Sequence, residues 1–333
     1  MSGPALVATA DYHTAGEPFR IVTGGVAVPP GATVADRRVA AAARLDHVRR
    51  LLTSEPRGHP GMYGGFVTPP DDDGAELGVI FFHRSGFSTA CGHGTIALAT
   101  WARQAGLIAP GRDTFSIDVP SGRVQVLVRG DGASPEVAFR NVGAWVAERG
   151  RAVETPLGPA RVDIAFGGAF YASLPAAALG LAVEPGQLPD LIAAGRAIQR
   201  GLDAAGAARH DTDDRLSGIY GVIFYDELPD PGDGQLHQRN VTVFGDGQID
   251  RSPCGSGTTT RLALLAGHGL ADGQALIHDS IIGTRFTGRV ISAAAGRGRT
   301  VVATEVTGRA YLTGLHQFLL ADDDPLGSGF ELG

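Results

Sequence analysis

A five-residue motif occurs twice in this chain, once in each half of its 333 residues. The copies are Cys91–Thr95 (CGHGT) and Cys254–Thr258 (CGSGT), and they agree at the cysteine, both glycines and the threonine. Each is followed at the same distance by a Gly-Leu pair, Gly106-Leu107 and Gly269-Leu270. Unrelated loops seldom share so many positions. The sequence therefore predicts an internal duplication into two halves of similar build.

The segments that follow the two motifs carry no charge. Ile96–Ala102 and Leu262–Ala266 are made of apolar and small residues, and a helix that is apolar all round is normally buried. Gly106 and Gly269 then suit the C-terminal caps of such helices. Each cysteine is thus predicted at the N-terminus of a buried helix, where unpaired N–H groups and the helix dipole stabilise an anion. We expect both thiols to be acidified by this position.

Composition limits the partners and the location of the chain. Twenty-eight basic against 35 acidic residues give a net charge of −7, without a basic run, so we expect neither nucleic acid nor an anionic membrane surface as a partner. No apolar stretch is long enough to span a bilayer, and the first residues do not resemble a signal peptide. These observations favour a cytoplasmic protein, as a monomer or a homodimer.

Short strand-like runs separated by Gly- and Pro-bearing turns alternate with a few helical stretches, which indicates an α+β fold. The chain turns polar near Glu148–Pro156 and then begins a new series of strands. Its last strand-like run, Gln317–Leu320, is expected to return to the first half. The predicted domains are residues 1–150 with 315–333, carrying Cys91, and residues 151–314, carrying Cys254.

Two acidified thiols, one from each half, suit a reaction in which both act on one small substrate. A thiolate removes a proton from a carbon acid, and the opposite thiol returns a proton to the other face, which is racemisation or epimerisation without a cofactor. A substrate carboxylate would need aligned donors. The backbone N–H groups of the two motifs supply them, from Gly92, His93, Gly255, Ser256 and Gly257. Asp250 can hold an ammonium group by a charge-assisted hydrogen bond.

Other interpretations of the same residues remain open at this point. The cysteines could be inert core residues or form a structural disulfide, although the latter is rare in the cytosol. Zinc ligation by Cys91, His93, Cys254 and His13 is conceivable, but these residues lack the usual ligand spacing, and no metal is predicted. His93 could be a hydrogen-bonding member of its turn, and Asp250 could serve only as an acid at a helix N-terminus.

At these motifs the sequence resembles the proline racemase family, which includes 4-hydroxyproline 2-epimerases and trans-3-hydroxy-L-proline dehydratases. The resemblance covers nearly the whole chain, and the pair of cysteine motifs is highly specific. The matching stretches are Asp11–Arg20, Glu55–His59, Cys91–Gly94, Asp250–Gly257, Gly283–Gly288 and Asp322–Pro325. The family implies a fold like diaminopimelate epimerase, with two pseudo-symmetric domains, each a curved, mostly antiparallel sheet around a central helix.

The resemblance also implies roles for individual residues. Cys91 and Cys254 match the catalytic pair, and Asp250 matches the partner of the substrate's ring nitrogen. Tyr63 and Phe244 match aromatic residues that pack against the pyrrolidine ring. The carboxylate-binding positions are matched by Gly92, His93, Gly255 and Ser256.

Within the family, the framework is most similar to the 3-hydroxyproline dehydratases, as in Gly61–Gly64 and Gly167–Ala172. Those enzymes typically have threonine where this chain has Cys254, because one base, here Cys91, suffices to remove the alpha proton before the 3-hydroxyl leaves. With both cysteines kept, the sequence predicts a proline racemase or 4-hydroxyproline 2-epimerase. The alternatives are a trans-3-hydroxy-L-proline dehydratase and a non-catalytic protein that binds pyrrolidine carboxylates.

Overall fold

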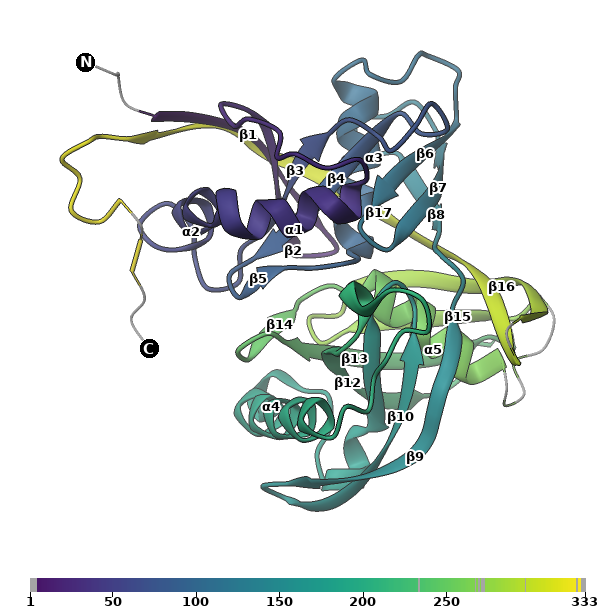
Figure 1. The fold of residues 1–333 in the computed structure, drawn as a ribbon. Helices are drawn as coiled ribbons and strands as arrows, with labels where there is room; N and C mark the ends of the chain where they lie inside the picture. Colours follow the sequence, from purple (N-terminus) through teal and green to yellow (C-terminus); the bar gives the residue numbers. More distant parts are fainter. Residues whose placement is uncertain are drawn as a thin grey trace. The chain divides into compact units, whose positions relative to one another are not determined.

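The chain divides into two compact units, described from a computed structural model that covers residues 5–232, 234–266, 268, 270, 273–296, 298–327 and 329–330 (Figure 1). One unit comprises residues 1–137 and 309–333, and the other comprises residues 138–308. Both boundaries fall inside strands, whereas the sequence led us to expect them after residues 150 and 314. Because continuous strands make both crossings, no polar linker marks them in the sequence.

The first unit is built on a mixed, mostly antiparallel sheet. Strand β2 pairs with β3 and strand β4 with β6 in parallel, while β1 with β2, β3 with β4, β4 with β5 and β6 with β7 are antiparallel. Its strands are β1 Ala5–Thr14, β2 Glu17–Gly24, β3 Tyr63–Thr68, β4 Leu77–His83, β5 Gly86–Phe87, β6 Thr114–Val119 and β7 Gly122–Arg129, and β8 Glu136–Arg140 leads into the second unit.

The second unit repeats this pairing pattern. Strand β11 pairs with β12 and strand β13 with β15 in parallel, while β10 with β11, β12 with β13, β13 with β14 and β15 with β16 are antiparallel. An added strand, β9, flanks β10. The bounds are β9 Trp145–Thr155, β10 Gly158–Phe166, β11 Phe170–Pro175, β12 Ile219–Leu228, β13 Leu236–Phe244, β14 Gln248–Asp250, β15 Ala275–Ser280 and β16 Arg285–Gly296.

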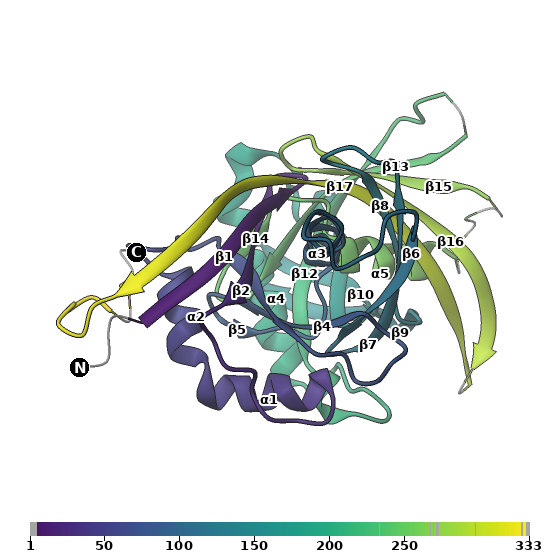
Figure 2. The same cartoon turned by 90° about the horizontal axis from the view of Figure 1, so that it is seen from above.

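The same order of parallel and antiparallel pairs in both units matches the duplication predicted from the cysteine motifs. In each unit a helix follows the fourth strand of the repeat and its short partner: α3, Gly92–Gln104, in the first and α5, Gly255–Ala266, in the second. The predicted α+β class and the sheet around a central helix are therefore confirmed. Figure 2 looks nearly along α3, which contacts β1, β2 and β7 of its own unit.

Both central helices are buried over most of their length, as the uncharged segments Ile96–Ala102 and Leu262–Ala266 predict, and α5 also buries Arg261. Gly106 follows the end of α3 with a φ of 73°, the left-handed conformation expected of a glycine cap. Its predicted counterpart, Gly269, lies outside the described residues. Within those residues no helix is long and apolar enough to cross a membrane.

Further helices cover the outer faces of the sheets. In the first unit, sequence spacing predicts one helix over Ala35–Leu52, but the structure has two, α1 Val34–Arg44 and α2 Asp46–Thr53, which meet at Leu45. The break lets α2 bury its own apolar side, including Leu51 and Leu52.

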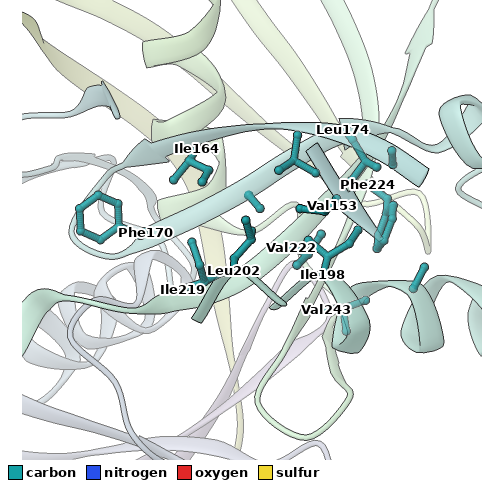
Figure 3. Packing of buried hydrophobic residues seen from close by; sticks show 14 of the residues in the cluster. Val153, Ile164, Phe170, Leu174, Ile198, Leu202, Ile219, Val222, Phe224 and Val243 are labelled. Atoms are coloured by element: carbon teal, nitrogen blue, oxygen red, sulfur yellow. The ribbon is translucent and has the colours of Figure 1, made fainter. Parts of the chain in front are cut away.

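In the second unit, α4, Leu188–Ala204, packs on the sheet. Figure 3 shows Ile198 and Leu202 of α4 meeting side chains from β11, β12 and β13, among them Leu174, Val222 and Val243. This is the principal apolar core of the unit.

The chain returns to the first unit through β17, Arg299–Leu320. Its first part pairs with β16 and its last part with β1, both antiparallel. The pairing of Gln317 with Ala8 and of Leu320 with Ala5 fulfils the expectation that the run Gln317–Leu320 belongs with the first half.

Candidate active site

Cys91 lies at the N-cap of α3, in an extended conformation with a φ of −156°. Its sulfur accepts a hydrogen bond from the Gly94 N–H at 3.3 Å, and both ring nitrogens of His93 lie 3.5 Å from it. The side chain is nearly buried, at 6% exposure. The predicted position at the start of a buried helix is thus correct for Cys91, and an imidazole lies beside its sulfur.

Aromatic rings pack against His93, the imidazole beside this thiol. The rings of Tyr63 and Phe19 meet the His93 imidazole edge to face, with centroids 4.9 and 5.7 Å away. The Tyr63 hydroxyl is hydrogen-bonded to the Ser88 hydroxyl at 2.5 Å. Thr14 of β1 donates to the His93 carbonyl at 2.9 Å, which fixes the first turn of the helix to the sheet.

Gly94 is the residue that allows the sulfur to approach the helix. A Cβ at this position would lie 2.8 Å from the Cys91 sulfur and would overlap the Phe19 ring. We expect Gly94→Ala to destabilise the protein by about 1–3 kcal/mol, as overpacking does, and to lower the melting temperature. Gly201→Ala is the matched control, since nothing lies within 4 Å of a Cβ there. Equal melting temperatures for the two variants would contradict the tight fit.

Cys254 precedes α5 in the same way, but its backbone is different. Its φ is 61°, in the left-handed region that residues other than glycine rarely adopt. Its N–H donates to the Ser252 hydroxyl at 3.1 Å, and its carbonyl accepts from the Thr258 N–H at 2.7 Å. As in the first motif, the sulfur accepts the N–H of the second glycine, Gly257, at 3.3 Å. The repeat therefore preserves the N–H···S contact but not the backbone conformation of the cysteine.

The electrostatic setting of Cys254 differs from the prediction. Burial raises the pKa of the thiol well above its usual range, and the nearby Asp250 carboxylate raises it further, while hydrogen bonds from the Gly257 N–H, Thr242 and Tyr171 lower it. The Tyr171 hydroxyl lies 3.8 Å from the sulfur. The prediction of an acidified thiol is therefore wrong for Cys254 in this structure, because desolvation outweighs the helix N-terminus.

Asp250, at the end of β14, is brought close to Cys254 and is 4% exposed. It accepts the Ser252 N–H at 2.8 Å, and Ser252 in turn accepts the Cys254 N–H. Burial raises the pKa of the Asp250 carboxyl to about 6, against opposing hydrogen bonds from Ser252. A buried carboxylate with a raised pKa is suited to pairing with a cation.

Phe244 lies at the end of β13, on the strand that pairs with β14. Its ring stacks on Tyr220 with centroids 5.7 Å apart, and Tyr220 meets Tyr171 edge to face at 5.5 Å. An aromatic row thus runs from Phe244 to the hydroxyl next to Cys254.

The structure gathers the predicted residues into two clusters, one in each unit. The first unit holds Cys91, Gly92, His93 and Tyr63, and the second holds Cys254, Gly255, Ser256, Asp250 and Phe244. Their assigned roles stay predictions. Both cysteines are free thiols. In the described part of the chain, no three His, Cys, Asp or Glu side chains are grouped as a metal site requires.

Sequence reasoning missed four side chains that contact the predicted ones. Ser252 lies between Asp250 and Cys254 in the sequence, so its position between two predicted site residues could have identified it as part of the site. Ser88 lies three residues before Cys91, and Thr242 of β13 pairs with Asp250, so the stretches that lead into the two motifs contain both. Tyr171 is contributed by β11, far away in the sequence, and no local pattern marks it.

Comparison with known proteins gives a consistent result. The family model described as proline racemase matches residues 9–331. A trans-3-hydroxy-L-proline dehydratase of Bacillus cereus is 41% identical over 332 residues, 98% of each chain. A 3-hydroxyproline 2-epimerase of Burkholderia multivorans is 40% identical, with 97% of each covered. The crystal structure of a hydroxyproline epimerase from Agrobacterium vitis, with bound trans-4-hydroxy-L-proline, superposes with a TM-score of 0.92 at 30% identity, covering 100% of this chain and 96% of that one.

Proposed function

The chain belongs to the proline racemase family, and we propose that it is a cofactor-independent racemase or epimerase that uses Cys91 and Cys254 at the alpha carbon of proline or hydroxyproline. The observation that carries the proposal is the pair of matched thiols. Each precedes the central helix of its unit, and each accepts the N–H of the second glycine of its motif at 3.3 Å.

The proposed reaction needs only proton transfers. One cysteine, as thiolate, takes the alpha proton, and the electron pair left on carbon is delocalised into the substrate carboxylate. The other cysteine, as thiol, then donates its proton to the opposite face, so the product has the inverted configuration and the two cysteines have exchanged protonation states. The N–H groups at the starts of α3 and α5 stabilise the charge that develops on the carboxylate.

In this scheme Asp250 binds the ring ammonium of the substrate. Its carboxylate is buried and its pKa is raised, so an arriving cation would offset the cost of keeping the charge buried. The same cation would counter the effect of Asp250 on Cys254, whose thiol pKa the carboxylate raises. Substrate binding would thereby lower the pKa of the Cys254 thiol towards the pH at which the enzyme works.

A second candidate is a trans-3-hydroxy-L-proline dehydratase, the activity named for the Bacillus cereus relative at 41% identity. In that reaction Cys91 removes the alpha proton and passes a proton to the 3-hydroxyl, which leaves as water, and the resulting enamine tautomerises to a cyclic ketimine. No proton is delivered to the opposite face, so Cys254 would not be needed as an acid.

The function is tested by incubating the protein in D2O with L-proline, trans-4-hydroxy-L-proline and trans-3-hydroxy-L-proline, followed by proton NMR. With the true substrate we expect the alpha-proton signal to disappear and the 2-epimer, or D-proline detected by chiral chromatography, to form with deuterium at the alpha carbon. The protein with Cys91→Ser serves as the control.

The competing outcomes are distinct in the same experiment. Consumption of trans-3-hydroxy-L-proline without any epimer, together with proline after borohydride reduction, would identify the dehydratase. Absence of exchange with all three substrates, despite binding of the planar carbanion mimic pyrrole-2-carboxylate, would instead indicate a non-catalytic binding protein.

A further inference from the structure

The two thiols have different hydrogen-bonding neighbours, although their motifs are repeats. Next to Cys91 stands an imidazole, with both ring nitrogens 3.5 Å from the sulfur. Next to Cys254 stands a phenol, with the Tyr171 hydroxyl at 3.8 Å. An imidazole can change its charge near neutral pH, whereas a phenol ordinarily does not. Tyr171 is thus a neutral partner of the second thiol, which also interacts with the Asp250 carboxylate and with Thr242.

Tyr171 lies beside the sulfur, buried in the middle of the sheet. It lies in β11 between Ala165 of β10 and Gly221 of β12, and it is 1% exposed. Ala169 and Ile223 complete the apolar surroundings of Cys254. Burial, followed by the charge of Cys254, raises the pKa of the Tyr171 hydroxyl well above its usual range. The hydroxyl therefore keeps its proton over the pH range in which a thiol reacts.

A protonated phenol can form a hydrogen bond with both the thiol and the thiolate form of the cysteine. Its oxygen accepts a hydrogen bond from the S–H group of the thiol, and its O–H donates to the sulfur of the thiolate. The donated bond to the anion is the stronger of the two. Tyr171 therefore favours the thiolate, and it acts against burial and Asp250, which favour the thiol.

We propose that Tyr171 is a positioning residue for Cys254. The Tyr171 hydroxyl stays hydrogen-bonded to the Cys254 sulfur and exchanges its donor and acceptor roles at each proton transfer. This rests on the proposed function, since it assigns Tyr171 a part in the cycle of the second cysteine. The hydroxyl contacts the sulfur, and no contact with substrate is assigned to it.

Other charged or titratable groups border this cluster and must stay constant in a test. Asp250 acts on both Cys254 and Tyr171, and Tyr220 acts on Tyr171. His278, on β15, is hydrogen-bonded to Thr258 of α5, and burial lowers its pKa to about 3, so it is neutral. Arg251 follows Asp250, and Arg261 lies further along α5. Replacing Tyr171 by phenylalanine leaves all of these in place.

The direct test is the rate of alkylation of each cysteine by iodoacetamide, measured by peptide mass spectrometry at a fixed pH of about 8. In Tyr171→Phe the thiolate of Cys254 loses a donor, so its pKa rises and its thiolate fraction falls. Because the less acidic thiolate is also more nucleophilic, the expected fall in rate is about threefold. The rate at Cys91 should not change. Epimerisation, if present, should show its alkaline pH limit moved upward while the acidic limit stays.

Two further variants separate this role from simple packing. Tyr12→Phe is the matched control, because it removes another buried tyrosine hydroxyl, one bonded to Gln104 at the C-terminal end of α3; it should leave both alkylation rates unchanged. Placing 3-fluorotyrosine at position 171 supplies a more acidic, stronger donor and should raise the Cys254 rate. It also keeps the test valid if the phenylalanine variant folds poorly.

The proposal is overturned if the phenylalanine variant, with an unchanged melting temperature, alkylates Cys254 at the wild-type rate, or if Cys91 slows equally. Alkylation needs no turnover. If the wild-type protein has no epimerase activity but Tyr171→Phe still slows the alkylation of Cys254, the proposed function is contradicted. The effect of Tyr171 on the thiol is then still supported.

Discussion

Cys91→Ser and Cys254→Ser are each expected to lose epimerisation by about 10²–10⁴-fold, the usual contribution of a positioned acid or base. A serine hydroxyl does not ionise at the pH where a thiol does, so neither variant can complete a cycle that needs one base and one acid. The measurement is the initial rate of epimer formation in D2O with the substrate identified by NMR. Serine is nearly isosteric with cysteine, so folding should be preserved.

Binding provides the control for this prediction. Both variants should still bind pyrrole-2-carboxylate, measured by calorimetry, because the N–H groups of α3 and α5 and the Asp250 carboxylate are unchanged. Epimerisation at the wild-type rate in either variant would contradict the two-thiol mechanism. If Cys254→Ser instead forms ketimine from trans-3-hydroxy-L-proline at the wild-type rate while Cys91→Ser does not, the protein is the dehydratase.

Asp250→Asn is expected to lose activity and gain stability at the same time. The variant cannot pair with the substrate ammonium, and losing a hydrogen bond to a charged partner costs about 1.5–3 kcal/mol, so we expect kcat/KM to fall by about 10–100-fold. Asn keeps an oxygen that can accept the Ser252 N–H. The local fold should therefore be retained.

The gain in stability follows from the raised pKa of Asp250, which is about 6 in the folded protein against about 3.9 in the unfolded chain. Below pH 4 both states bind the proton and the group has no effect. As pH rises from about 4 to 6, the unfolded state releases its proton first, so the free energy of unfolding falls. Above pH 6 the carboxylate lowers stability by about 3 kcal/mol.

Melting temperatures of the wild type and Asp250→Asn should therefore coincide near pH 4 and separate above pH 6, with the variant the more stable. Asp246→Asn is the control, since this exposed residue lies between β13 and β14 and close to Asp250 in sequence; its pH dependence should follow the wild type. A variant that is less stable than the wild type at pH 8 would contradict the destabilising effect of the buried carboxylate.

The stability and activity changes are linked by one physical cause. Burial raises the pKa of a carboxyl group and makes its charged form destabilising, and a buried carboxylate attracts a cation for the same reason. Such a residue is expected where a ligand completes the charge balance, which is the role proposed for Asp250.

The sequence by itself determined the features that depend on neighbours along the chain. The two CGxGT motifs and the uncharged segments after them predicted two equivalent halves, each with a cysteine at the start of a buried helix, and α3 and α5 begin where these motifs lie. Helix formation, capping and the demand for glycine depend on residues within one or two turns, so a local pattern is sufficient to predict them.

Only the tertiary structure decided how the two thiols differ. Cys91 is extended, whereas Cys254 adopts a left-handed φ and contacts Tyr171, a residue of β11 that is distant in the sequence. Burial then raises the pKa of Cys254, where helix position alone predicts the opposite. Desolvation and contacts between distant strands depend on how the sheet closes around the helix. Two motifs of nearly identical sequence therefore cannot predict them.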